Sequence, residues 1–180
     1  MDVVSAQGDL SRAYVGGGPG VIVSSLVWFA AALIERREGV ETAFIALFLA
    51  GMLIFPLGTL MCRFLFKRER ESPANPLGGL ALASTIAMIG CLLAAWLFLP
   101  FRPELVFPVA AIAVGTHYAV FRTIYGDRLF WLLAGLITAV GLVAIFDIAP
   151  IPAGNIFAVG VIELLFGLVL TMRAKRAFAR

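Results

Sequence analysis

Charged residues are scarce in this chain. Asp, Glu, Lys and Arg make up 14% of its 180 residues, whereas hydrophobic residues make up 62%. A soluble domain carries about 25% charged and about 45–50% apolar residues. So few charges exclude a soluble globular fold, because too little polar surface would remain to cover the core. No basic stripe interleaved with aromatic residues is present, so the sequence predicts no nucleic-acid partner.

Residues that bind metals or carry nucleophilic chemistry are also few. The chain has one histidine, His117, and two cysteines, Cys62 and Cys91. It contains no CxxC pair, no Cys/His metal spacing, no HExxH motif and no Ser/His/Asp constellation. The cysteines fall in different predicted spans at different depths, so we expect no disulfide. The sequence therefore predicts no metal site and no cofactor, and it gives an enzyme little support.

Long apolar runs, in contrast, fill most of the chain. A run of about 18 or more apolar residues is long enough to cross a bilayer as a helix. Six segments near or above this length are predicted, at about Gly18–Ile34, Thr42–Cys62, Leu77–Phe98, Leu105–Ile124, Leu129–Phe146 and Ala153–Met172. The predicted fold class is an all-α polytopic membrane protein, a bundle of six transmembrane helices whose main partner is the lipid bilayer.

Three regions follow from this division. Residues 1–17 form a polar N-terminal segment, residues 18–172 a single six-helix transmembrane domain, and residues 173–180 a basic tail. The first segment lacks the positive n-region of a secretory signal, so we interpret the following apolar run as a retained span. Within the second span, Pro56 is expected to kink the helix.

Basic residues are distributed unevenly between the two sides of the predicted bundle. Eleven of the fourteen Lys and Arg residues fall on the side that holds both termini. The three on the opposite side are Arg36, Arg37 and Arg102. Because cytoplasmic loops carry the excess of Lys and Arg, this bias predicts cytoplasmic N- and C-termini.

One carboxylate, Glu163, lies near the centre of the last predicted span. Ionisable side chains at mid-membrane are costly and mark functional sites. Glu163 comes about ten residues, or roughly 15 Å, into its span, and His117 about twelve residues, or roughly 18 Å, into the fourth. Because these two spans run in the same direction, the side chains would pair if the spans pack together, which would lower the cost of burying either.

Three further side chains follow His117 on one helical face. Tyr118, Arg122 and Tyr125 are spaced by four and three residues. This face would line an aqueous vestibule that opens to the cytoplasm. Alternatively, Arg122 and Tyr125 are anchors at the membrane interface, where arginine and tyrosine are both favoured. The candidate ligand- or ion-binding residues are thus Glu163, His117, Tyr118 and Arg122.

Small residues are concentrated in the third and sixth spans. Gly160 and Gly167, seven residues apart, lie on one face of the sixth span. Such faces allow two helices to approach closely. The approach can occur within one chain or between copies, so a homo-oligomer stays open.

Several short motifs point to a family resemblance. They are VIVSSLVW ending at Trp28, Pro56 before a basic span end, NPLG at Asn75–Gly78, Gly115-Thr-His117, Tyr125, and IELLF around Glu163. With these motifs the chain resembles a family of small bacterial membrane proteins defined only as a domain of unknown function. The resemblance covers nearly the whole chain and implies six spans and bacterial origin. We therefore expect the protein in the bacterial inner membrane.

Two functional interpretations follow from these residues. In the first, the protein binds or transports a small solute or ion, with Glu163 as the mid-membrane site and His117 tuning its protonation. In the second, the protein has a structural or regulatory role without transport, and Glu163 and His117 lock helices together. An intramembrane enzyme acting on a lipid-like substrate has the least support, because the sequence offers no nucleophile and no metal cluster.

Overall fold

The computed structural model describes residues 1–177, which form helices and loops without any strand. All six predicted spans are helical, which confirms the all-α fold class. The corresponding helices are α2 (Gly18–Glu38), α3 (Val40–Gly51) with α4 (Ile54–Leu60), α5 (Leu77–Trp96), α6 (Val106–Tyr125), α7 (Leu129–Ile145) and α8 (Asn155–Ala177). Two of them, α2 and α8, continue past the apolar run into charged residues.

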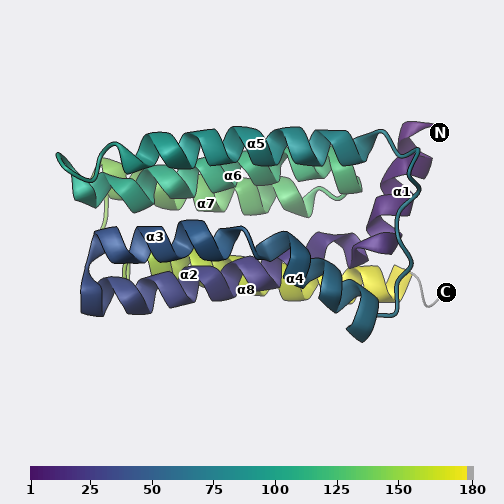
Figure 1. Ribbon diagram of the computed structural model, residues 1–180, viewed down its shortest axis with the longest axis horizontal. Helices are drawn as coiled ribbons and strands as arrows, with labels where there is room; N and C mark the ends of the chain where they lie inside the picture. The colour runs from purple at the N-terminus through teal and green to yellow at the C-terminus, as the bar shows by residue number, and fades with distance from the viewer. Residues whose placement is uncertain (178–180) are drawn as a thin grey trace.

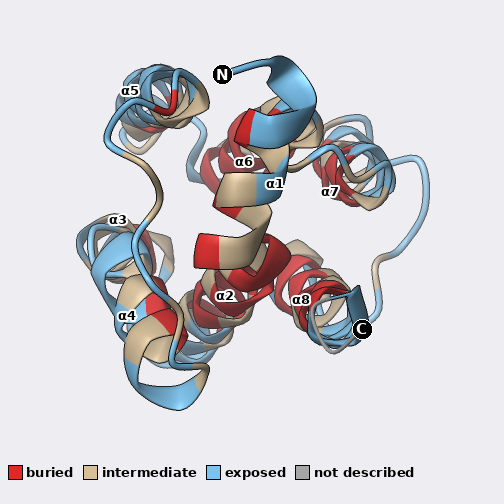
Figure 2. Ribbon diagram, turned by 90° about the vertical axis from the view of Figure 1, so that its right-hand side faces the viewer, coloured by how far each residue is buried: buried red, intermediate tan, exposed pale blue. Residues whose placement is uncertain are grey.

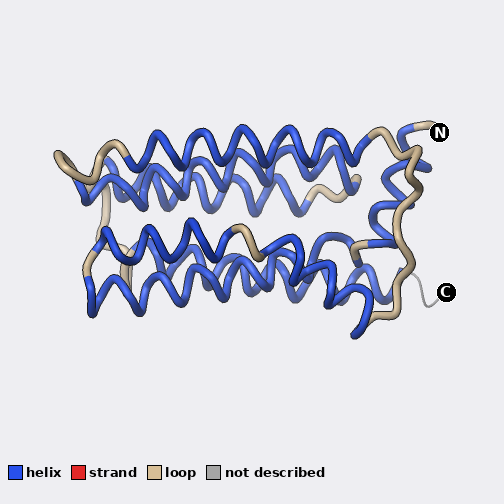
Figure 3. Tube along the Cα trace, in the orientation of Figure 1, coloured by secondary structure: helices blue, strands red, loops and turns tan. Residues whose placement is uncertain are grey.

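The long helices lie nearly parallel in two layers. Helices α5, α6 and α7 form one layer, and α2, α3, α4 and α8 form the other (Figure 1). Short connections join neighbouring helices at both ends of the bundle (Figure 3). The most extensive contacts join α6 to α7, α2 to α8, and α5 to α6. Buried residues gather on the inward faces of α2, α6 and α8, which therefore form the centre of the molecule (Figure 2).

Four helical segments are long and apolar enough to cross a membrane. They are Val15–Glu38, Leu77–Trp96, Pro103–Tyr125 and Asn155–Ala177. The bent pair Val40–Gly51 and Ile54–Leu65 makes a fifth candidate if it is counted as one span. Helix α7 is apolar but shorter, with 17 residues. The described residues thus give four to five candidate spans where the sequence predicts six.

The expected kink in the second span is confirmed. Helices α3 and α4 meet at Met52 and Leu53 with a bend of 45°. Pro56 lies in the first turn of α4 and has no backbone N–H to donate to the carbonyl of Met52, four residues earlier. The break lies on the N-terminal side of the proline because the lost hydrogen bond and the ring clash both act there. Past α4 the chain continues into a π-helical turn, η2 (Met61–Leu65).

The N-terminal segment, which the sequence marked only as polar, contains an amphipathic helix. Helix α1 (Val3–Ala13) is capped by Asp2, whose carboxylate accepts a hydrogen bond from the Ser5 N–H at 2.8 Å. It buries Ala6, Leu10 and Ala13, spaced by four and three residues. The helix lies across the end of the bundle where α8 also ends (Figure 1). A short turn, η1 (Val15–Gly17), leads from α1 into α2.

Candidate functional site: a carboxyl buried between three helices

Glu163 is fully buried near the middle of α8. One carboxylate oxygen, Oε1, accepts a hydrogen bond from the hydroxyl of Tyr118 on α6 at 2.9 Å. The other oxygen, Oε2, is buried and has no hydrogen-bond partner among the described residues. Ser24 of α2 lies beside both the Glu163 carboxyl and the Tyr118 hydroxyl. Three helices from distant parts of the sequence thus contribute the polar groups of this site.

Glycines bring α2 and α8 close enough to build the site. A Cβ atom at Gly167 would lie 2.7 Å from the Ile22 side chain and 2.9 Å from its backbone nitrogen. At Gly160 a Cβ atom would lie 2.8 Å from the ring of Phe29. The close approach expected from these two glycines therefore occurs within one chain, against α2. By contrast, a Cβ atom at Gly78, Gly79 or Gly90 of α5 would meet nothing within 4 Å.

Aromatic packing holds Tyr118 in place. Its side chain is 6% exposed, and its ring stacks on Phe130 of α7 with 6.4 Å between centroids. Phe121, one turn further along α6, also contacts this pair, at 6.1 Å from Tyr118 and 5.8 Å from Phe130. These rings leave the hydroxyl directed at Glu163, so the hydrogen bond depends on the positions of α6, α7 and α8 together.

His117 does not form the expected pair with Glu163. Its Nδ1 atom lies 2.8 Å from the Ser84 hydroxyl of α5, and its ring packs edge-on against Phe121 at 4.6 Å. Consecutive helical residues point about 100° apart. Tyr118 therefore faces α8 and His117 faces α5. His117 lies one residue before Tyr118 on α6, so it is close to Glu163 in height, but Tyr118 makes the contact.

Arg122 and Tyr125 lie nearer the end of α6 than Tyr118. The guanidinium of Arg122 lies over the ring of Trp131 on α7, 5.6 Å from its centroid. Its Nε atom is buried and has no hydrogen-bond partner among the described residues. The ring of Tyr125 packs against Gly17, where a Cβ atom would lie only 2.7 Å away. Of the four candidate site residues, the structure brings Tyr118 and Glu163 into direct contact.

A polar network that the sequence analysis did not identify ties α1 to the α4–α5 connection. Asp9 accepts hydrogen bonds from the backbone of Ser72 at 2.8 Å and from the Asn75 amide at 3.0 Å, and it pairs with Arg12 at 2.8 Å. Burial opposes ionisation of Asp9, but these three donors outweigh it and hold the pKa of its carboxyl below the usual 3.8. Asn75 also donates to the carbonyl of Ala6. In the sequence, the NPLG motif at Asn75–Gly78 stood out, but it did not indicate that Asn75 contacts α1.

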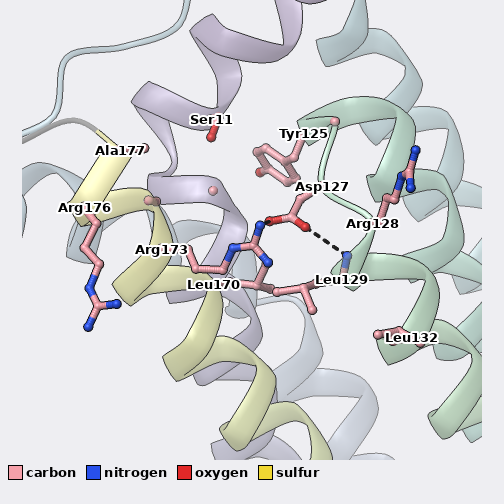
Figure 4. A pocket seen from close by; sticks show the side chains of 13 residues that line it. Ser11, Tyr125, Asp127, Arg128, Leu129, Leu132, Leu170, Arg173, Arg176 and Ala177 are labelled. Carbon is pink, nitrogen blue, oxygen red and sulfur yellow. Dashed lines mark hydrogen bonds and ion pairs between the residues drawn. The ribbon is translucent and has the colours of Figure 1, made fainter. Parts of the chain in front are cut away.

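A pocket of about 850 Å³ opens at the same end of the molecule, between α8 and the α6–α7 turn. Asp127 lies in this turn, where its carboxylate accepts a hydrogen bond from the Leu129 N–H at 2.9 Å and lies 3.6 Å from Arg173 of α8 (Figure 4). Tyr125 also lines the pocket. Cys62 and Cys91 are both free, and no group of three His, Cys, Asp or Glu residues within the described range could hold a metal ion.

The helices around this buried polar site include four to five that are long and apolar enough to cross a membrane, which indicates an all-helical membrane protein. The chain belongs to a family of unknown function, DUF7010, whose family model matches residues 3–173. This match confirms the resemblance to a family without an assigned function. No curated protein and no solved structure matches the chain.

Proposed function

We propose that this protein is a six-span protein of the bacterial inner membrane in which Glu163 takes up and releases a proton as part of binding or transporting a small solute. The observation that carries this proposal is the unequal pairing of the carboxyl. Oε1 accepts the Tyr118 hydrogen bond, whereas Oε2 is buried without a partner. A carboxylate in this position keeps an unsatisfied charge in an apolar surrounding, which is costly.

A proton is the ligand that fits this arrangement best. Bound to Oε2, it would turn an unpartnered acceptor into a donor, and the adjacent Ser24 hydroxyl can accept from it. A metal cation would need several oxygen ligands, whereas this site offers one carboxylate and two hydroxyls. Uptake of a proton would let Oε2 donate to the Ser24 hydroxyl, and release would leave that hydroxyl free to donate to the carboxylate instead, while Tyr118 stays bonded to Oε1. Proton exchange at Glu163 is thereby coupled to the position of α2.

The six-span topology is part of the proposal. Helix α7, with 17 residues, spans roughly 25 Å and is at the short end of transmembrane lengths. If α7 and the bent α3–α4 pair each cross once, α1 and the end of α8 lie on one side of the membrane. The excess of Lys and Arg assigns that side to the cytoplasm.

Infrared difference spectroscopy of the protein in lipid across a pH range tests proton exchange at Glu163. We expect a protonated-carboxyl C=O band that responds to pH and disappears in Glu163→Gln. The amide of that variant can still accept the Tyr118 hydrogen bond, so its melting temperature should stay near that of the parent. A thermal-shift screen at several pH values should then give a solute-dependent shift that Glu163→Gln abolishes. A carboxyl band insensitive to pH would overturn the proposal.

A structural role is the second candidate, favoured by the bonds between helices. Tyr118–Glu163 joins α6 to α8, and Ser84–His117 joins α5 to α6. If these bonds serve only to lock the bundle, Glu163→Leu and Tyr118→Phe should lower the free energy of unfolding. In that case the carboxyl band should ignore pH, and no solute should raise the melting temperature.

A further inference from the structure

The pocket beside the α6–α7 turn is basic on its rim. Arg128 at the start of α7 and Arg173 and Arg176 in the last turns of α8 all line it. Figure 4 shows Arg173 directed at Asp127, whereas Arg128 and Arg176 extend on opposite sides of the pocket. The lining therefore holds one carboxylate and three guanidinium groups, which leaves a net positive charge.

Two of these arginines are available for a ligand. The Arg128 and Arg176 side chains form no hydrogen bond or ion pair with residues 1–177. Arg173 pairs with Asp127 at 3.6 Å, and its side chain is 58% exposed, so that pair is weak. Arginine is well suited to phosphate because its planar guanidinium donates two parallel hydrogen bonds to phosphate oxygens.

The lower wall of the pocket is apolar and continues along the outside of the bundle. Leu129, Leu132 and Leu170 line the pocket below the arginines. Leu132 is 60% exposed, and the exposed Leu136 follows it one turn further along α7. A charged rim above a leucine surface at the end of apolar helices matches a molecule with an anionic head and a hydrocarbon chain.

We propose that this pocket binds the headgroup of an anionic phospholipid. Its phosphate would lie against Arg173, with the flexible side chains of Arg128 and Arg176 turning inward from the two sides of the pocket, and an acyl chain would follow Leu132 along α7. Basic pockets between helices at the cytoplasmic face are suited to acidic headgroups. The inference uses the membrane setting and orientation of the proposed function, but not the proton site at Glu163, so either can fail alone.

The test uses the whole protein in zwitterionic detergent, titrated with phosphatidylglycerol, phosphatidylcholine of the same chain length, or inorganic phosphate. Retained lipid is counted by native mass spectrometry, and the melting temperature reports binding by mass action. The test variant is Arg128→Gln with Arg176→Gln. The control is Lys67→Gln with Arg70→Gln, which removes two exposed charges from the same end but away from the pocket.

We expect phosphatidylglycerol to bind in preference to phosphatidylcholine. The pocket variant should bind it roughly 25-fold more weakly, or about fivefold per arginine, and the control should bind it like the parent. Equal losses in both variants would reveal general surface attraction and overturn the proposal. A shift produced fully by inorganic phosphate, without further gain from the lipid, would also overturn it in favour of a free phosphate ligand. Absence of binding by the parent would overturn it outright.

Discussion

The Tyr118 hydroxyl donates to Oε1 of Glu163 across 2.9 Å, and this bond joins α6 to α8 at the most buried carboxyl of the described chain. Losing this bond should cost more stability than the bond itself contributes, because a buried acceptor would then remain without a donor. The bond also explains why Tyr118, rather than His117, is the partner to alter in experiments.

Tyr118→Phe should lower the free energy of unfolding by about 1 kcal/mol, since it removes the donor that bonds the buried Oε1 of Glu163. Denaturant titration in detergent measures this loss. Tyr125→Phe is the matched control, because it removes the same atom from the same helix at a hydroxyl that bonds no side chain within residues 1–177. Equal effects of the two substitutions would contradict a special role for the Tyr118–Glu163 bond.

Ser84→Ala should loosen α5, whose most extensive packing is against α6. It removes the hydroxyl that bonds His117, and polar bonds between membrane helices contribute about 0.6 kcal/mol on average. Faster hydrogen exchange of α5 amides would report the change. Thr85→Ala is the control, because its hydroxyl donates to the Ala81 carbonyl within α5. An exchange rate in Ser84→Ala that equals that of the control would count against this prediction.

Gly167→Ala should destabilise the α2–α8 contact by about 1–3 kcal/mol through overpacking. The new methyl group would lie 2.9 Å from the backbone nitrogen of Ile22, which has no room to move without shifting α2. Gly135→Ala in α7 should instead be neutral or stabilising, since nothing lies within 4 Å and alanine favours helix. Melting temperatures of the two variants would separate these effects, and a stable Gly167→Ala would mean that α2 and α8 lie further apart.

The attachment of α1 should weaken in acid. Because the pKa of Asp9 lies below 3.8 in the folded protein, its ionised form contributes stability above that value, and this stability is lost as pH falls below it. Limited proteolysis between Ala13 and Gly17 at decreasing pH measures the release. Asp9→Asn should remove the pH dependence, whereas Asp147→Asn, an exposed residue elsewhere, should preserve it. A parent protein cut equally at neutral and acidic pH would contradict the role of Asp9.

Much of the fold could be predicted from the sequence because hydropathy is a local property. The six helices and the kink before Pro56 follow from runs of apolar residues and one missing N–H. Helix α1 was not predicted, because its apolar stripe is narrow and its mean composition is polar. The place of α1 in the fold depends on the hydrogen bonds of Asp9 with Ser72 and Asn75, which are distant from it in the sequence.

The candidate site, like the fold, could be predicted only in part from the sequence. The sequence by itself determined that Glu163 is a carboxylate at mid-span and that Gly160 and Gly167 permit a close helix contact. Only the tertiary structure decided that α2 makes that contact, that Tyr118 donates to Glu163, and that His117 turns to Ser84. The reason is rotational: depth along a helix follows from residue number, but direction changes by about 100° per residue, and packing sets which helix lies in each direction.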